Sequence, residues 1–339
     1  MANWGTEIHL LNILLMAISL LVAIWLPFEL FIFVYAFIGP LHYITEINWL
    51  KRNDFFIKDS GQVWILVFLS LVVSIPVSLI ALAGHFGELK FANKIYEFIE
   101  GYFGSIVFIS LIAAIGLIYT KKKSVLFILT ILGVLIAGFL NEGSFYILIT
   151  ALLIPSVIHV YFFTLIFMAY GLTKTKSRAG LIELLALVLL PLIIVLIPIK
   201  SIDFVNGART LDIINQGGFQ RVNLAIGEIL GLAQIEINEL NHVSSVAVKI
   251  QIFLSFAYLY HYLNWFSKIS IIGWLKNTSS NKIIFMTILW IGSVVLYIYN
   301  FRLGLSLLFI MSFMHVVLEF PLNLLSMRSL LIYVKGFFR

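Results

Sequence analysis

Histidine and glutamate occur twice with the same spacing inside long apolar stretches of this sequence. His42 precedes Glu46 by four residues, and His315 precedes Glu319 by four residues. In a helix, residues four apart share one face, with their Cβ atoms about 5–6 Å apart. An imidazole and a carboxylate placed in this way can bind one metal ion together, or the carboxylate can orient a metal-binding imidazole. Each pair is therefore a candidate part of a metal site, with Glu46 and Glu319 as candidate catalytic carboxylates.

Two further histidines lie in apolar stretches without a glutamate four residues later. His261 stands in the segment Tyr-His-Tyr-Leu-Asn-Trp, and Tyr, Asn and Trp also follow His42. Such side chains can supply hydrogen bonds and the wall of an apolar substrate cavity. His159 has no comparable polar neighbours. The candidate metal ligands are therefore His42, His159, His261 and His315.

The donor types restrict the metal. The sequence contains no cysteine, so disulfides, thiolate metal sites and iron–sulfur clusters are excluded. Imidazole and carboxylate ligands suit iron, zinc, copper or manganese. Three or four histidines with glutamate nearby, enclosed by apolar side chains, favour non-haem iron (Fe²⁺) and oxygen chemistry on a lipophilic substrate. Another divalent metal fits the same donors.

Transmembrane helices are the elements predicted to carry these residues. Of the 339 residues, 62% are hydrophobic and 11% are charged, and the mean hydropathy is +1.08. An ordinary soluble domain has about 25% charged residues, so lipid must be the solvent for most of this chain. We expect an all-α, polytopic helical bundle that forms a single transmembrane domain over residues 1–339. The apolar stretches predict about ten spans, at residues 8–26, 28–50, 62–84, 102–120, 124–140, 144–170, 180–199, 250–267, 283–299 and 303–327.

The distribution of basic residues predicts the orientation of these spans. If the N-terminus is cytoplasmic, the inner loops and the C-terminal tail hold 15 of the 22 Lys and Arg residues. This enrichment satisfies the positive-inside rule with both termini in the cytoplasm, and we expect a multi-pass protein of the cell (inner) membrane. The net charge of +6 is then a feature of topology, and no nucleic-acid partner is expected.

The predicted topology also places the four histidines at a similar depth. One lies on each of the second, sixth, eighth and tenth spans, all of which run from the outside to the inside. Each is within about 12 residues of the inner end of its span, roughly 18 Å at ~1.5 Å per residue. A common depth favours one shared site, because ionisable residues inside a membrane are functional candidates by default. In the simpler alternative, each histidine bonds a carbonyl or hydroxyl group of a neighbouring helix.

Other ionisable residues are assigned to packing or to solvent. Glu183 lies near the inner end of the seventh predicted span, where we interpret it as an interfacial or packing carboxylate. His9, His85 and His242 are at span ends or in loops, and we expect them to be solvated.

One predicted outer loop, residues 200–249, is much longer than the others. It contains an amphipathic stretch at 222–240, which predicts an extracytoplasmic interfacial helix or a lid over the bundle. A plain solvated connector is the equally weighted alternative.

Short segments around two of the histidines resemble the Brp/Blh-type membrane β-carotene dioxygenases. Residues 37–42 (Phe-Ile-Gly-Pro-Leu-His), followed by Glu46, are similar to the Gly-Leu-Pro-His-Gly-x-x-Asp element of that family. Residues 311–319 are similar to its late element with a histidine and an acid. The resemblance implies a helical membrane protein in which histidines hold iron and a carotenoid is cleaved with O₂. His42 would then be an iron ligand, and His261 would stand for the mid-chain ligand segment.

These features lead to one functional expectation and several alternatives. We expect a membrane metalloprotein, a non-haem iron oxidoreductase or oxygenase, whose lipophilic small-molecule substrate (a carotenoid, quinone or acyl chain) enters from the lipid bilayer. The alternatives are a proton-coupled transporter that uses the intramembrane His and Glu residues, a non-catalytic subunit of a membrane complex, and a two-haem cytochrome. Phosphate-binding glycine loops, His-Glu-x-x-His helices and nucleophile elbows do not occur in the sequence.

Overall fold

The part of the chain that the structure describes is mainly helical, with one short pair of strands and connecting turns. The computed structural model describes residues 4–86, 90–200, 202–203, 210, 213, 220–231, 242–268, 273, 276 and 278–337. Among these residues, nine helices are long and apolar enough to cross a membrane. The prediction of a polytopic all-α membrane protein is confirmed. The nine are Glu7–Trp25, Pro27–Arg52, Ser60–Gly84, Lys123–Leu140, Ser144–Thr175, Arg178–Leu196, Ser245–Ser267, Ser280–Tyr299 and Phe301–Gly336.

A tenth span arises from two helices that meet at a sharp bend. Helix α5 (Lys90–Glu100) and helix α6 (Phe103–Tyr119) are bent by 62° across a two-residue break. Counted together they bring the total to ten, which agrees with the predicted number. The predicted span at 102–120 coincides with α6, and α5 is a separate amphipathic helix.

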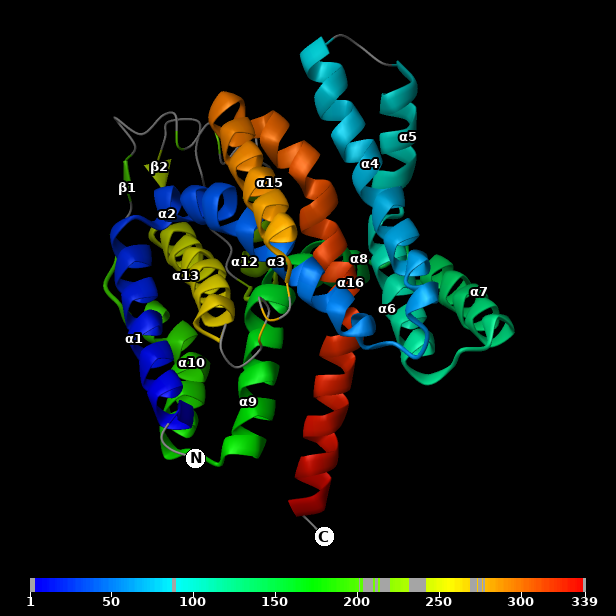
Figure 1. Cartoon of the computed structure of the whole chain (residues 1–339). Coiled ribbons are helices and arrows are strands. Elements are labelled where there is room, and N and C mark those ends of the chain that lie inside the picture. The colour runs from blue at the N-terminus through cyan, green and yellow to red at the C-terminus, as the bar shows by residue number, and fades with distance from the viewer. Residues whose placement is uncertain are drawn as a thin grey trace. The chain divides into compact units, whose positions relative to one another are not determined.

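The chain folds into two compact units, each assembled from segments far apart in the sequence (Figure 1). Two long helices run from one unit into the other. The continuous helix Pro27–Arg52 changes unit at Gly39, and α16 (Phe301–Phe337) changes unit after Arg328. Unit 1 comprises Met1–Ile38, Val157–Gly273 and Ser329–Arg339, and unit 2 comprises Gly39–Ser156 and Trp274–Arg328.

Unit 1 is built around helix α13 (Ser245–Ser267), which packs against both α1 (Trp4–Trp25) and α10 (Arg178–Leu196) (Figure 1). The side chains of Phe256 and Tyr260 in α13 are almost fully buried. Helix α13 also buries polar residues such as Gln251 and His261, because it is covered mainly by protein rather than lipid. The other helices of this unit are α2 (Pro27–Phe33), α9 (Phe163–Thr175) and α12 (Gln220–Ile229).

Unit 2 packs several helices against the first part of α16. Its helices are α3 (Gly39–Arg52), α4 (Trp64–Phe86), α5, α6, α7 (Lys123–Leu140), α8 (Ser144–Ile147), α15 (Ser280–Tyr299) and the short 3₁₀ turns η2 (Asp54–Phe56) and η3 (Ser60–Gln62). The hydroxyl of Ser78 on α4 donates a 2.7 Å hydrogen bond to the carbonyl of Ser306 on α16. The ring of Phe103 on α6 lies 5.4 Å from that of Phe313 on α16. Together these contacts join α4 and α6 to α16.

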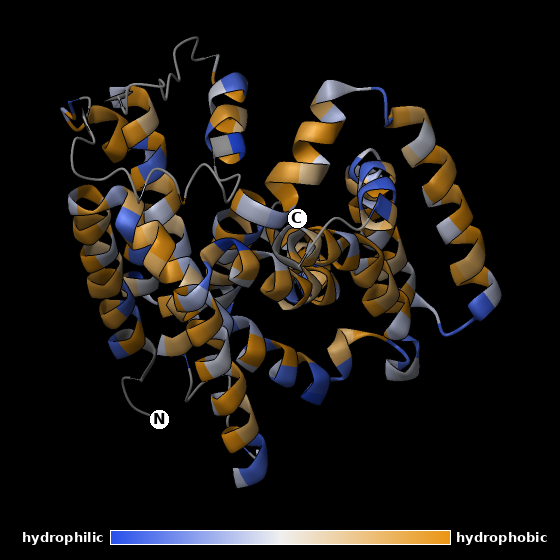
Figure 2. Ribbon diagram, turned by 90° about the horizontal axis from the view of Figure 1, so that it is seen from above, coloured by the Kyte–Doolittle hydropathy of each residue, from blue (hydrophilic) through white to orange (hydrophobic). Residues whose placement is uncertain are grey.

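Apolar side chains cover the outer faces of the peripheral helices. Phe139 on α7 is 86% exposed, and Ile298 on α15 is 77% exposed. Figure 2 shows long hydrophobic helices with hydrophilic residues gathered at helix ends and connections. Such faces are stable only against lipid, so the chain is a multi-pass membrane protein.

Two stretches of π-helix interrupt the regular α-helices. The segment η1 (Val34–Ile38) lies directly before α3, and η4 (Leu148–Phe162) contains Pro155 and leads into α9. Short π-helical turns inside α-helices occur frequently at functional sites. Here η1 ends four residues before His42, and η4 contains His159.

The segment after α10 is described only in part. The strand β1 (Ile202–Asp203) pairs antiparallel with β2 (His242–Val243), which closes the base of this segment. Helix α12 packs on α13, and Asn223 donates a buried 3.2 Å hydrogen bond to Gln251. The predicted amphipathic stretch continues to residue 240, and its part after Gly231 lies outside the described residues.

Candidate metal site

Two helices of unit 2 bring both His–Glu pairs together. His42 and Glu46 lie on α3, and His315 and Glu319 lie on α16. All four side chains are buried, with exposures of 1% to 3%. The four-residue spacing gives each pair one helix face, and the two faces meet inside the unit.

The donor atoms of three of these residues lie close together. The Nε2 atom of His42 is 2.9 Å from Oε2 of Glu46. The imidazole rings of His42 and His315 are 5.5 Å apart and perpendicular. One donor atom from each of His42, Glu46 and His315 lies within 4.8 Å of the other two. Two donors on opposite sides of a metal ion are about 4.2 Å apart when each bond is ~2.1 Å. The three side chains therefore need to approach one another only slightly to bind one ion.

Packing around α3 holds this face in place. Tyr43 and Ile44 of α3 form a buried cluster with Met286 of α15. The ring of Tyr43 also lies 5.8 Å from the ring of His315. The hydroxyl of Thr45 donates within its own helix, to the carbonyls of Leu41 and His42. Apolar and aromatic side chains therefore pack beside the His–Glu face.

The fourth residue adds a second carboxyl group beside the first. The carboxyl groups of Glu46 and Glu319 are close neighbours inside the unit. The amide of Asn323 donates a 3.3 Å hydrogen bond to Oε2 of Glu319. Sequence reasoning missed Asn323, although it follows Glu319 at the same four-residue spacing that marked the His–Glu pairs. We therefore describe unit 2 as containing a buried four-residue cluster, the α3–α16 cluster, defined as His42, Glu46, His315 and Glu319.

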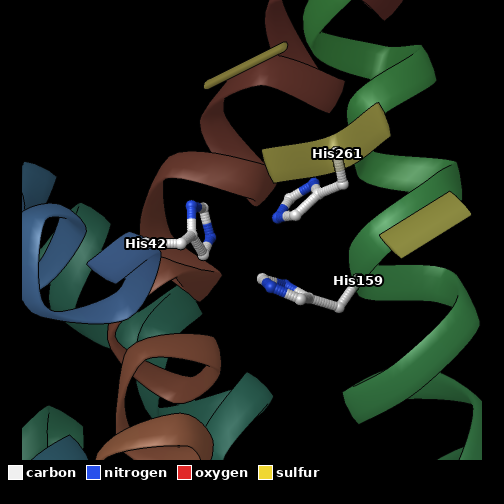
Figure 3. A group of neighbouring side chains, drawn as sticks. All are labelled: His42, His159 and His261. Atoms are coloured by element: carbon white, nitrogen blue, oxygen red, sulfur yellow. The ribbon is translucent and has the colours of Figure 1, made fainter. Parts of the chain in front are cut away.

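The other two candidate histidines meet in unit 1. The rings of His159 on η4 and His261 on α13 are 5.1 Å apart at 61° (Figure 3). The hydroxyl of Thr164 lies 2.8 Å from Nδ1 of His261, a contact that sequence reasoning did not anticipate. Both histidines are buried. A single site formed by all four histidines would join the two units, and it stays a prediction.

A second His–Glu contact in unit 1 corrects the assignment of His9. We expected His9 to be solvated, but its Nδ1 atom lies 2.5 Å from Oε2 of Glu183. Glu183 is 2% exposed, and the hydroxyl of Tyr260 donates a 3.1 Å hydrogen bond to its other oxygen. We call these three residues the Glu183 cluster. The prediction for His9 was wrong because the partner lies 174 residues away, which no local pattern reveals.

Lys268 extends the Glu183 cluster toward the end of α13. Burial lowers the pKa of the Lys268 ammonium group, and the carboxylate of Glu183 acts in the opposite direction. Ser267, the residue before Lys268, donates a 2.7 Å hydrogen bond to Asn12 of α1.

In comparisons with known proteins, no family model, no curated protein and no solved structure matches this chain. The functional conclusion therefore rests on the residues and geometry of the site.

Proposed function

We propose that this chain is a membrane metalloprotein of the non-haem iron class that oxidises a lipophilic substrate. The observation that carries the proposal is the α3–α16 cluster, in which two imidazoles and a carboxylate place donor atoms within 4.8 Å of one another in a buried position. Two histidines and one carboxylate are the ligand set of non-haem iron oxygenases with open coordination positions.

Charge supports a cation at this position. Glu46 and Glu319 are buried neighbours, and acidic groups removed from water are commonly paired with a cation or coordinated to a metal. A divalent ion bound by His42, Glu46 and His315 would balance that charge. The amide of Asn323 donates a hydrogen bond to Glu319, and such hydrogen bonds orient the groups around a metal site.

The protein's own residues also define the environment of the reaction. When bound, iron supplies the binding and activation of O₂. The cluster residues hold the donors, and Tyr43 with its apolar neighbours keeps water away. Exposed apolar faces on the transmembrane helices give a lipophilic molecule access from the bilayer. The resemblance of residues 37–42 to the Brp/Blh-type dioxygenases makes a carotenoid the first substrate to test.

The experiment is metal analysis of protein purified in mild detergent without a metal-affinity column. We expect about one iron atom per chain and no haem absorption, and we expect His42→Ala and His315→Ala to lose the iron. The matched control is Glu183→Gln, which alters a buried carboxylate outside the α3–α16 cluster and should keep its iron. Repeated metal-free preparations from iron-supplemented cells would overturn the proposal.

A proton-coupled transporter is the second candidate, and the Glu46–Glu319 contact favours it. Two carboxyl groups in contact can share one proton, and intramembrane carboxyl groups of this kind form proton relays. This function predicts metal-free protein and substrate flux in proteoliposomes that follows an imposed pH gradient. Glu46→Gln would then abolish the flux.

A further inference from the structure

A groove of about 400 Å³ lies between α4 and α7 in unit 2. This volume is within the range of about 300–1,000 Å³ that encloses small ligands in proteins. Its walls are apolar over most of their length, and Phe68 and Phe127 on its rim are more than half exposed. The lining residues are Gln62, Trp64, Ile65, Phe68 and Leu69 on one side, and Lys123, Leu126, Phe127 and Thr130 on the other.

One end of the groove is polar and strongly basic. Lys123 lines the groove, and it is the last of three consecutive exposed lysines at positions 121–123. Lys58 adds another exposed cation on the neighbouring connection. The backbone N–H of Lys58 donates a 3.0 Å hydrogen bond to the carbonyl of Leu117. The same connection carries Asp54 and Asp59, and Asp59 accepts hydrogen bonds from Gly61 and Gln62. Positive charge therefore dominates at this end.

The basic connection is held at the groove by a buried amide. The side chain of Gln62 is 4% exposed, and its Nε2 atom donates a 2.9 Å hydrogen bond to the carbonyl of Lys121. The same atom donates a 3.0 Å hydrogen bond to Asp59. Gln62 thus fixes the start of the lysine run next to the groove instead of leaving it on a free loop.

An aromatic residue marks the level of the membrane interface at the same end. Trp64 lines the groove and is 60% exposed. Exposed tryptophan is enriched where lipid headgroups meet the hydrocarbon region. Going along the groove from Lys123 and Trp64 toward Phe68 and Thr130, the surface changes from headgroup-like to acyl-chain-like surroundings.

We propose that this groove is a binding site for an anionic phospholipid. The acyl chain lies along the apolar wall between α4 and α7, and the phosphate lies against Lys121, Lys122 and Lys123. Charge complementarity selects an anionic headgroup, because juxtamembrane lysines attract anionic lipids while zwitterionic lipids gain little from them. The site is distinct from the α3–α16 cluster and does not depend on the proposed function.

The test is lipid binding by native mass spectrometry on the full chain in detergent. The probes are phosphatidylglycerol and phosphatidylcholine with identical acyl chains. We expect retention of phosphatidylglycerol on the wild type, with an affinity at least about tenfold above that of phosphatidylcholine. Equal retention of the two lipids would overturn the proposal.

Two variants separate the headgroup contact from the groove. The triple variant K121Q/K122Q/K123Q should lose the preference for phosphatidylglycerol. Its matched control, K174Q/K176Q/R178Q, removes three cations from a different connection and should keep the preference. An equal loss in both would show that overall charge, and not this site, attracts the lipid.

A groove-filling variant keeps all charges and therefore leaves membrane orientation unaltered. Thr130→Trp places a large ring in the acyl-chain region, and it should reduce phosphatidylglycerol binding by about tenfold or more. Retained binding in this variant would mean that the lysines bind headgroups without the groove, which contradicts the proposal.

Discussion

The Glu183 cluster and the α3–α16 cluster both contain histidine and glutamate, but in different numbers. The Glu183 cluster has one carboxylate, and each of its oxygens meets a partner, His9 on one side and Tyr260 on the other. The α3–α16 cluster has two carboxyl groups in contact and two imidazoles. In the first cluster the protein itself satisfies the acid. In the second, two carboxyl groups and two imidazoles meet, and under the proposed function a cation would balance the acidic charge.

The comparison explains why a buried His–Glu contact alone does not define a metal site. A buried ion pair that satisfies itself commonly stabilises a particular packing arrangement. In the α3–α16 cluster, by contrast, donor atoms of two imidazoles and a carboxylate converge from two helices, which is an arrangement that can hold a metal ion. Under the proposed function, the Glu183 cluster has a structural role and the α3–α16 cluster holds the metal.

The largest effect should come from breaking the Glu183 cluster at one residue. His9→Leu leaves a buried carboxylate without its imidazole partner, and loss of one partner of a buried pair costs about 3–5 kcal/mol of stability. We expect a clear fall in the thermal midpoint in detergent with unchanged iron content. Combining it with Glu183→Met removes the charge as well and should recover most of the stability. A double variant as unstable as His9→Leu would contradict the structural assignment.

A smaller effect should follow from Asn323→Leu in unit 2. The change removes the hydrogen bond to Glu319, and outer partners of metal ligands are commonly worth about 10–100-fold in metal affinity. Chelator competition measures the affinity. The control is Asn12→Leu, a buried asparagine of unit 1 that accepts a hydrogen bond from Ser267 and should leave the affinity unchanged. Equal metal affinities in the wild type and Asn323→Leu would show that Asn323 does not contribute to metal binding.

Gly180→Ala should perturb the Glu183 cluster more gently. A Cβ atom at Gly180 would lie 2.9 Å from two ring atoms of His9, so the imidazole has to move away from Glu183. Overpacking of this kind costs about 1–3 kcal/mol, measured as a shift of the thermal midpoint. Gly171→Ala is the control, because nothing lies within 4 Å of a Cβ atom there. In the His9→Leu background, Gly180→Ala should cost a different amount of stability, because the effects of substitutions at neighbouring residues are not additive.

The smallest effect concerns Lys268 and depends on pH. Because burial lowers its pKa in the folded state, the unfolded chain holds the proton up to a higher pH than the folded chain does. Stability therefore rises with pH between the lowered pKa and the ordinary value of about 10.4. Below that window Lys268→Met should be more stable than the wild type by about 1 kcal/mol or less, and the difference should shrink as the pH rises through it. A difference that does not vary with pH would show that Lys268 titrates normally.

Much of the fold could be predicted because hydropathy and length decide it. Long apolar stretches must become helices in lipid, since every backbone N–H and carbonyl has to be bonded within the segment. The bend between α5 and α6 was less accessible, because the amphipathic sequence 90–100 is compatible with a loop or an interfacial helix. The π-helical stretches η1 and η4 have no simple sequence signal, and they depend on the packing of the surrounding helices.

The candidate site was predictable to the extent that its spacing is local. The pairs His42–Glu46 and His315–Glu319 each follow from a four-residue interval, and the same interval marks Asn323. Which helix faces meet is a long-range property, as the 174-residue separation of His9 and Glu183 illustrates. His9 was misassigned because its position near the start of a span suggested water, whereas its ring contacts Glu183 and lies beside Gly180 of α10. Only tertiary packing distinguishes these cases.

The length of α16 has a consequence for the membrane itself. Its 37 residues correspond to about 55 Å at ~1.5 Å per residue, whereas the hydrocarbon core of a bilayer is about 30 Å thick. Even a strongly tilted helix of this length extends beyond the hydrocarbon on at least one side. The final turns of α16, with Lys335 and an exposed Tyr333, then lie at the level of the lipid headgroups. A spectroscopic label placed there would report the depth of this helix end in the bilayer, and so how the tilt of α16 changes when the bilayer thickness is varied.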